Sequence, residues 1–592
     1  MFHGCWTCLD WSKESRSEWP CSRSSAVANG RPVRIVHLKN KGFQDPGTTS
    51  KIRIFERMAS LSPSLLVRPE DIPQEIALPS PLHTREYLFD GELRVWDGPT
   101  QEVLSPLSTS GPAGPERIVL GSCPVHDAVA GMAALHAACA AWDNGLGQWP
   151  NLDVEARMAC VEDFCRRMRS RRAEIVRLMV WEICKPTKES EQEFDRTIEY
   201  IEATLAAMRE MAAEAGRVIA ASGLRALCGR SARGVTLCLG PFNFPLNETL
   251  ATLIPALLMG NTAVVKLPRI GRLLFTPLLD CFHKAFPRGV VNSVSGGVEA
   301  VTPMMRSGLV DVLAFIGSSK SAEALRALHP RPTRLHCVFG LEAKNAAIIL
   351  PDADLDVTVA EVLRGAYGFN GQRCTALKLV LASRLVADAF LERLRASAEH
   401  LKIGLPWEPG VGITPLPEPG KPRFLESLRK DALSRGAREL LPGAGMLDET
   451  LFAPSLLAPV TPDMRLYHEE QFGPVLPVGL FDDPEEALRA VAASNYGQQA
   501  SLFGSDVQVL ARLSGRLRNL VSRVNINCKC QRGPDELPFT ARKDSAVGTL
   551  SVGEGLAAFS LPTLTVLRHS SADGGVLSAL GAVAPNSSPP RS

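Results

Sequence analysis

The stretch GVTLCLGPFNFPLNETLATLIPALLMGNTAVVKLP, residues 234–268, decides the fold class. Its opening run GVTLCLG is apolar, uncharged and of strand length, and the longer apolar segment 246–259 ends at Gly260 and Asn261, which is typical of a buried helix. A second short apolar run, TAVVKLP, follows directly. A strand, a helix and a strand in this order predict two parallel strands joined by a crossover helix.

The same alternation continues towards the C-terminus. Helical segments over 271–286, near 298–306 and from Ser319 separate the strand-like runs VVNSVSG, DVLAFIG and RLHCVFG. Beyond residue 340 the runs NAAIIL and ALKLVLAS flank a helical segment over 355–367. We therefore expect an α/β protein with two doubly wound domains, whose ligands bind beyond the carboxyl ends of the strands.

The composition is that of an ordinary globular protein with several domains. The chain has 592 residues, of which 45% are hydrophobic and 22% charged. Its formal net charge of +2 gives no reason to expect nucleic acid or an anionic membrane as a partner. The longest uncharged stretch that is worth testing as a membrane segment, Thr249–Val265, contains Pro255 and is too short to span a bilayer. We expect a cytoplasmic protein without a membrane segment.

The two ends differ in composition from the rest of the chain. Residues 1–57 contain ten Lys and Arg against five Asp and Glu, with little apolar periodicity, and we expect them to be disordered. Met58 begins a more ordinary sequence and is an alternative start. Residues 570–592 are rich in Ser, Gly, Ala and Pro, which predicts a flexible tail.

The fifteen cysteines are scattered along the chain, which favours free thiols in a reducing compartment. Cys5 and Cys8 form a CxxC motif, but no second pair follows, so we expect no zinc or other metal. Cys374 lies in FNGQRCTALK, residues 369–378. A lone cysteine packs more often as a small hydrophobic residue than it acts as a nucleophile. A catalytic role for Cys374 therefore needs support from other residues.

Polar residues follow several of the predicted strands. Asn243 ends the first strand, where its amide could donate to a developing oxyanion. Lys266 and Arg269 follow the second strand, either as solvated charges or as ligands of an anion. Gly317 and Ser318 close the fourth strand and open a helix whose free N–H groups suit a phosphate.

These residues, together with HEEQFGPV (468–475) and RVNINCKCQRGPDELPF (523–539), resemble the aldehyde dehydrogenase superfamily in order and spacing. The resemblance runs from about residue 80 to residue 568. The motifs FNGQRCTALK, VNIN, RGPD and LPF…KDS are most similar to the NADP-dependent non-phosphorylating glyceraldehyde-3-phosphate dehydrogenases.

The resemblance implies a covalent mechanism. The Cys374 thiolate would attack an aldehyde carbonyl, and hydride transfer to a nicotinamide would leave a thioester that water hydrolyses. Asn243 and the Cys374 backbone N–H would hold the oxyanion, with about 3 kcal/mol from each donor. We expect the neighbouring Arg373 and a cationic cofactor ring to lower the pKa of the thiol.

The resemblance also implies a cofactor site. Related enzymes that prefer NAD often carry a glutamate three positions after the lysine, where this chain has Arg269, and a guanidinium attracts a 2′-phosphate. We therefore expect NADP, with NAD less favoured. The cofactor-binding residues implied are Phe242, Lys266, Arg269, Gly317, Ser318, Glu470 and Phe472.

For the substrate, the expectation is that Arg373 and Arg532 clamp the phosphate of a small phosphorylated aldehyde, with Thr375 beside them, because the arginine fork matches phosphate oxygens. Alternatively, Arg373 only tunes the thiol and Arg532 forms a salt bridge with Asp535 in the same turn.

The pattern breaks at the water-activating glutamate of the family. This residue opens a Glu-Leu-Gly-Gly-Lys motif, but the chain reads FGLEAKN, with Gly340 at that position and a glutamate only at Glu342. Two positions along a strand move a side chain by roughly 6 to 7 Å. Three alternatives follow: Glu342 is the base, Glu470 acts through a water, or another acceptor such as coenzyme A takes the acyl group.

The expected function is NADP-dependent oxidation of an aldehyde to an acid, with D-glyceraldehyde 3-phosphate to 3-phosphoglycerate as the first choice. The alternatives are another aldehyde oxidation, including coenzyme-A acylation, and a non-catalytic nucleotide-binding relative. We expect a homo-oligomer, a dimer or a tetramer, joined by a β-arm. The expected segments are an NADP-binding domain at 78–340 with part of the arm near 205–232, a catalytic domain at 341–522 and the rest of the arm at 523–568.

Overall fold

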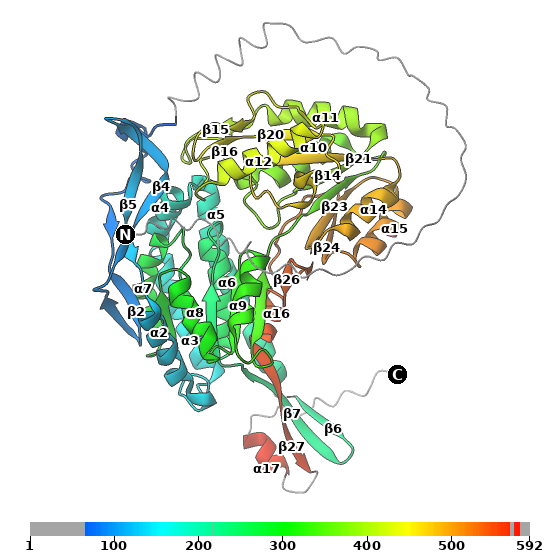
Figure 1. Ribbon diagram of the computed structural model, residues 1–592. Helices are drawn as coiled ribbons and strands as arrows, with labels where there is room; N and C mark the ends of the chain where they lie inside the picture. The colour runs from blue at the N-terminus through cyan, green and yellow to red at the C-terminus, as the bar shows by residue number, and fades with distance from the viewer. Residues whose placement is uncertain (1–64, 216, 569–572, 580–592) are drawn as a thin grey trace, which may run out of the picture. The chain divides into compact units, whose positions relative to one another are not determined.

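The structure is a computed structural model that describes residues 65–215, 217–568 and 573–579, all within one compact unit, Leu61–Ser592 (Figure 1). The predicted disorder of 1–57 and the CxxC motif lie outside the described residues. In the predicted flexible tail, Asp573–Ala579 forms helix α17, so this part of the prediction is wrong. Leu577 in this helix is buried, which gives the short helix an apolar anchor.

The first α/β segment forms a sheet in the order β10-β9-β8-β11-β12-β26. The five predicted strands are confirmed and pair in parallel, whereas β26 pairs antiparallel with β12. Their bounds are β8 Val235–Leu239, β9 Thr262–Lys266, β10 Val291–Val294, β11 Val312–Ile316, β12 His336–Gly340 and β26 Ala546–Val547.

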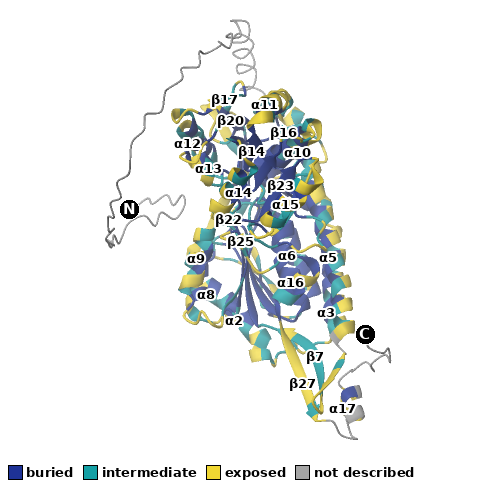
Figure 2. Ribbon diagram, turned by 90° about the vertical axis from the view of Figure 1, so that its right-hand side faces the viewer, coloured by how far each residue is buried: buried dark blue, intermediate teal, exposed yellow. Residues whose placement is uncertain are grey.

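Helices cover both faces of this sheet, as Figure 2 shows. In β8, Val235, Leu237 and Leu239 pack in the same apolar cluster as α2 and α8, whereas Cys238 packs with α6 on the opposite face. This alternation is the side-chain period of a strand buried on both sides. The helices are α2 Ala128–Trp142, α3 Val154–Arg169, α4 Arg172–Ile183, α5 Thr187–Ala215, α6 Pro245–Leu258, α7 Thr276–Ala285, α8 Val298–Ser307 and α9 Ser319–Leu328.

The second α/β segment forms a seven-stranded sheet in the order β17-β20-β21-β14-β13-β23-β24. The predicted strands β13 and β14 lie in its centre, next to the predicted helix α10, Leu355–Tyr367. The strands are β13 Ala346–Ile349, β14 Leu379–Ser383, β17 Arg438–Glu439, β20 Ser455–Ala458, β21 Val475–Phe481, β23 Gln499–Phe503 and β24 Arg523–Ile526, and the other helices here are α11 Arg384–Ala398, α12 Lys421–Ser434, α13 Arg465–His468, α14 Pro484–Ala493 and α15 Val507–Leu517.

A separate three-stranded antiparallel sheet consists of β6 Val218–Ala221, β7 Leu224–Ala232 and β27 Ser560–Arg568. The predicted arm at 523–568 is therefore too long, because β24 extends the seven-stranded sheet and β26 joins the first sheet. Strand β24 belongs to the seven-stranded sheet because its residues pair in parallel with Gln499 to Leu502 of β23. The predicted part near 205–232 also begins later, since α5 continues to Ala215. Helix α16, Val552–Ala558, leads into β27.

The residues before α2 form strands that the sequence did not predict. A long antiparallel pair, β4 Thr100–Gly111 and β5 Gly114–Pro124, carries the short parallel strand β1, Leu82–His83, and a hairpin of β2 Glu86–Phe89 and β3 Glu92–Val95 lies nearby. None of the described helices is both long and apolar enough to cross a membrane.

Candidate active site

A cleft of about 660 Å³ lies at the carboxyl ends of β8, β9, β11 and β12. It contains ten of the thirteen residues predicted from the sequence, together with Glu248. The predicted residues that line it are Asn243, Phe242, Lys266, Arg269, Gly317, Ser318, Glu342, Cys374, Glu470 and Phe472, with Gly340 beside them.

Cys374 follows a strained turn at the end of α10. The turn Gly368–Gly371 has Phe369 and Asn370 at φ 49° and 55°, a left-handed conformation that costs free energy for residues other than glycine. The side chain of Asn370 stabilises it, because its Oδ1 accepts the Thr414 N–H at 2.9 Å. Past the turn, Cys374 is partly exposed and lines the cleft.

Two side chains hold the backbone of Cys374 in place by hydrogen bonds. Asn345 Nδ2 and Lys378 Nζ both donate to the Cys374 carbonyl oxygen, each at 2.8 Å. Burial raises the pKa of the Cys374 thiol, and the Glu248 carboxylate raises it further, against the opposing effect of Lys378. The net shift of this pKa is therefore upward, opposite to the expected lowering by Arg373, because desolvation and the Glu248 carboxylate outweigh the nearby cations.

Asn243 lies between β8 and α6, and only 6% of it is exposed. Its Nδ2 donates to the carbonyl oxygen of Gln372 at 2.8 Å, two residues before Cys374. A carboxamide has two N–H donors, so this bond leaves a second N–H for an oxyanion. The structure thus brings the predicted nucleophile and the predicted oxyanion donor to the same end of the cleft.

A buried ion pair that the sequence analysis missed supports this arrangement. Lys185 and Glu193 have fully buried side chains, with Lys185 Nζ 2.5 Å from Glu193 Oε2. Lys185 Nζ also donates to the Asn243 carbonyl at 3.2 Å, and it lies 3.4 Å from the ring centroid of Phe244 and 4.5 Å from that of Phe369. One ammonium group therefore contacts both the Asn243 loop and the turn before Cys374.

The other end of the cleft carries cations and a helix start that could hold an anionic cofactor. Lys266 is partly buried, and desolvation lowers the pKa of its ammonium to about 8, with the positive charges of Arg272 and Arg269 acting in the same direction. A bound phosphate would relieve this unfavourable grouping of cations. Ser318 caps helix α9, and Phe242 and Phe472 meet edge to face with centroids 6.0 Å apart. These residues could hold the phosphates and a ring of a dinucleotide.

Glu342 lies in the cleft, but its carboxylate is already engaged. Glu342 Oε2 accepts the Ser319 N–H at 2.7 Å, at the start of α9, where the sequence predicts a phosphate. Glu470 Oε1 accepts the Ala343 N–H at 2.9 Å and lies 2.8 Å from Lys378 Nζ. Both alternatives for the water-activating base are therefore present in the cleft, and each is held by another partner.

The three predicted substrate-binding residues, unlike the other predicted site residues, do not line the cleft. Arg373 Nη2 donates to the carbonyl oxygens of Arg364 and Gly365 at 2.9 and 2.8 Å, and neither Arg373 nor the buried Thr375 is among the residues that line the cleft. The Arg373 guanidinium binds the C-terminal end of α10 and does not line the cleft, which differs from the position expected for a contact with a substrate phosphate.

Arg532 is buried behind the cleft wall. Its Nη1 donates to Glu248 Oε2, its Nη2 donates to the Leu550 carbonyl at 3.2 Å, and its Nε lies 3.4 Å from Asp535 Oδ1. The alternative that Arg532 forms a salt bridge with Asp535 is thus observed, and Glu248 is a partner that the sequence analysis missed. No periodic signal marked Glu248, because it lies on the uniformly buried helix α6.

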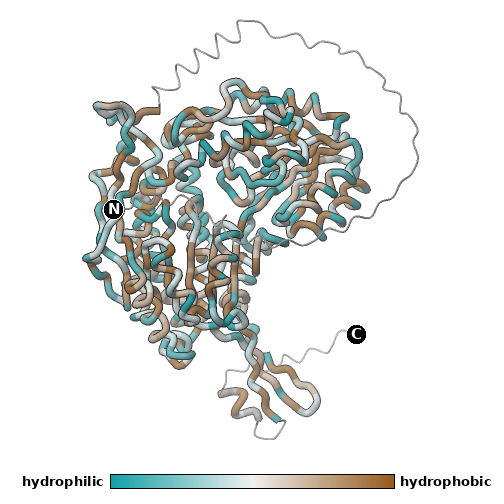
Figure 3. The backbone as a smooth tube through the Cα atoms, viewed as in Figure 1, coloured by the Kyte–Doolittle hydropathy of each residue, from teal (hydrophilic) through white to brown (hydrophobic). Residues whose placement is uncertain are grey.

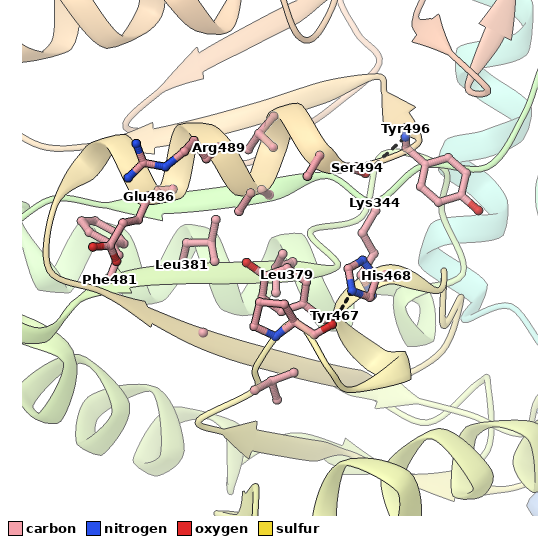
Figure 4. Close-up of a pocket in the computed structure, with 18 of the residues that line it drawn as sticks. Lys344, Leu379, Leu381, Tyr467, His468, Phe481, Glu486, Arg489, Ser494 and Tyr496 are labelled. Atoms are coloured by element: carbon pink, nitrogen blue, oxygen red, sulfur yellow. Dashed lines mark hydrogen bonds between the residues drawn. The ribbon is translucent and has the colours of Figure 1, made fainter. Parts of the chain in front are cut away.

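A second pocket of about 760 Å³ opens beside the first in the seven-stranded sheet (Figure 4). Leu379 and Leu381 of β14 form part of its wall, and Tyr467 and His468 lie across from α14. It shares Glu469 and Tyr496 with the cleft. Among the residues that the structure describes, no group of three or more His, Cys, Asp or Glu side chains is placed to hold a metal ion.

Comparisons with known proteins agree with this geometry. The sequence model of the aldehyde dehydrogenase family matches residues 112–563. A NADP-dependent glyceraldehyde-3-phosphate dehydrogenase from Streptococcus equinus is 36% identical over 344 residues, which cover 58% of this chain and 70% of the relative. One from Apium graveolens is 30% identical over 430 residues, covering 71% and 85%.

Among solved structures, the NADP-dependent glyceraldehyde-3-phosphate dehydrogenase from Bacillus halodurans, complexed with NADP, superposes with a TM-score of 0.75 at 29% identity. The match covers 83% of this chain and 100% of that structure. It extends over both α/β segments, so the fold predicted from the sequence is confirmed.

Proposed function

Because the chain belongs to the aldehyde dehydrogenase family, we propose that it oxidises an aldehyde to a carboxylic acid with NADP, through a covalent intermediate on Cys374. The observation that supports this proposal most is the shared cleft of Cys374, Asn243 and the cationic residues Lys266 and Arg269. A nucleophile, an oxyanion donor and an anion site within one cleft are the parts that this reaction requires.

Acylation uses the residues at the Cys374 end. The Cys374 thiol gives its proton to water, and the thiolate attacks the carbonyl carbon. The resulting oxyanion is stabilised by the free N–H of Asn243 and the Cys374 backbone N–H, and it becomes the thioester when its C–H bond breaks and the hydrogen leaves as hydride. NADP, when bound, supplies the hydride acceptor. Lys185 holds the loop that carries Asn243, so the donor does not need to reorganise during the reaction.

Deacylation requires a base, and Glu342 is the proposed one. Its carboxylate lines the cleft, but it has to leave the Ser319 N–H before it can activate a water. Glu470 is the alternative, and it has to be released from Lys378 and Ala343. Transfer of the acyl group to coenzyme A instead of water is the third route.

The proposed substrate is D-glyceraldehyde 3-phosphate, because the relatives described above are named for it. A second candidate is an unphosphorylated aldehyde of similar size. The observation that favours it is the pairing of Arg532 with Glu248, which occupies the arginine expected to bind the phosphate.

A substrate panel tests the proposal. Purified protein is mixed with NADP or NAD and with phosphorylated and unphosphorylated aldehydes, with and without coenzyme A, and formation of the reduced cofactor is followed by absorbance. We expect NADP reduction that does not require coenzyme A and that disappears in the variant Cys374→Ser. Full activity in Cys374→Ser, or no activity with any aldehyde, would contradict the proposed function.

A further inference from the structure

Glu248 is an acidic residue at the substrate end of the cleft. It lies on α6, five positions after Asn243, and it lines the same cleft as Cys374 although only 8% of it is exposed. Arg532, in contrast, is not among the residues that line the cleft. A ligand that enters at this end therefore meets a carboxylate before it meets a guanidinium.

The Glu248 carboxylate completes a balanced set of charges. Arg532 donates to Glu248 and lies near Asp535, while Arg196 donates to both oxygens of Asp535, at 3.1 and 2.7 Å. The positive charges of two arginines and the negative charges of two carboxylates thus neutralise each other. A phosphate dianion added to this set would leave it with an excess of negative charge in a poorly solvated place, which is unfavourable.

The position of Arg532 is fixed by more than its ion pairs. Its guanidinium carbon lies 4.9 Å from the ring centroid of Phe539 and 6.0 Å from that of Tyr200, and its Nη2 bonds the Leu550 carbonyl. Packing on two rings and a bond to backbone hold the cation in place. Access to Arg532 from the cleft therefore depends on a movement of Glu248.

We propose that Glu248 is a specificity-determining residue that shields Arg532 and disfavours aldehydes with a phosphate group relative to uncharged aldehydes of the same length. A phosphorylated substrate has to displace the Glu248 carboxylate from Arg532, whereas a hydroxylated aldehyde can donate a hydrogen bond to it. The inference rests on the proposed function, because it names the substrate preference of the same cleft, and it favours the second candidate named there, an unphosphorylated aldehyde, over D-glyceraldehyde 3-phosphate. The carboxylate also acts on the nucleophile, since it raises the pKa of the Cys374 thiol.

The test compares wild-type protein with Glu248→Gln, which removes the charge and keeps the size. We expect the ratio of kcat/KM for D-glyceraldehyde 3-phosphate to that for D-glyceraldehyde to rise at least about tenfold, because the amide no longer repels the phosphate. The matched control is Glu202→Gln, which removes a surface carboxylate paired with Arg169, and its ratio should equal that of the wild type. A change of less than twofold in Glu248→Gln, or a fall, would overturn the proposal.

Binding of glycerol 3-phosphate, measured by calorimetry, separates this inference from the proposed function. We expect Glu248→Gln to bind it at least about tenfold more tightly than the wild type does, and Glu248→Gln combined with Arg532→Gln to lose this gain. If neither protein oxidises any aldehyde but the binding gain appears, the proposed function fails and the role of Glu248 stands. Equal binding by wild type and Glu248→Gln overturns the role of Glu248 whatever the activity.

Discussion

At the scale of single residues, the protonation of Cys374 sets the reactivity of the cleft. Burial and Glu248 raise the pKa of this thiol, so most of it carries its proton at neutral pH in the protein without cofactor. Because only the thiolate reacts with iodoacetamide, the alkylation rate of Cys374 should rise about tenfold per pH unit from pH 7 to beyond the usual thiol range. Mass spectrometry of the Cys374 peptide measures this rate, and a plateau well below pH 8 would contradict the prediction.

Glu342 provides a second prediction at this scale. In Glu342→Gln the first turnover should still give a burst of reduced NADP, while the steady-state rate falls at least about a hundredfold, because acylation does not need the base and deacylation does. Rapid-mixing kinetics with mass detection of the acyl-enzyme measures both steps. The matched variant is Glu470→Gln, and a block of deacylation there with normal turnover in Glu342→Gln would assign the base to Glu470.

Arg269 carries the prediction on cofactor choice. It is exposed at the edge of the cleft and adds its charge to that of Lys266, so a glutamate in its place should repel a 2′-phosphate. We expect Arg269→Glu to raise KM for NADP by roughly ten- to a hundredfold, in line with the loss of one charged contact, and to change KM for NAD much less. Steady-state kinetics with both cofactors checks this, and equal effects on the two would remove the argument for NADP.

At the scale of elements, the site depends on contacts between α4, α5, α6 and the turn after α10. Glu193 on α5 accepts the N–H groups of Leu246 and Asn247, each at 3.1 Å, and so holds the start of α6. Lys185, which follows α4, joins this carboxylate to the rings of Phe244 and Phe369. The geometry at Cys374 is thus maintained by buried charges that never meet the substrate.

Removal of one partner of this ion pair should therefore affect both stability and activity. Lys185→Met leaves the buried Glu193 without its counter-ion, and we expect the free energy of unfolding to fall by about 3 to 5 kcal/mol. Adding Glu193→Gln, which keeps an acceptor for the two N–H groups, should restore part of the stability but not kcat, because the Asn243 carbonyl still lacks its donor. Urea unfolding and steady-state kinetics measure the two effects, and an unchanged stability in Lys185→Met would show that the pair contributes nothing.

The sequence predicted those strands whose own residues form a short apolar run. The strands β8 to β12 are short apolar runs, of which β8, β11 and β12 end in or directly before a glycine. Asn243, Lys266 and Ser318 lie at or just beyond the ends of three of them, at the ligand edge. The Arg532–Glu248 pair gave no such signal, because its members are 284 residues apart and meet only through tertiary packing. Likewise, Arg373 is next to the nucleophile in sequence, yet its side chain turns towards α10.

At the scale of the whole molecule, the sheet of β6, β7 and β27 exposes several large apolar side chains. Leu564 and Val566 of β27 are 66% and 51% exposed, and the arm appears in Figure 3 with several hydrophobic residues. A three-stranded sheet needs one covered apolar face to be stable in water. The predicted dimer or tetramer would supply this cover, with β27 of one copy packed against another copy.

Charge on the face of β27 that carries Leu564 and Val566 should therefore break the assembly. We expect the variant Leu564→Glu/Val566→Glu to sediment as a monomer and the wild type as a dimer or a tetramer, because two buried, unpaired carboxylates are strongly unfavourable in an interface. The control is Thr565→Glu, which places one charge on the opposite face of the same strand and should leave the assembly intact. Analytical ultracentrifugation measures all three proteins, and a wild type that is itself monomeric, or a double variant with the mass of the wild type, would contradict the role of β27.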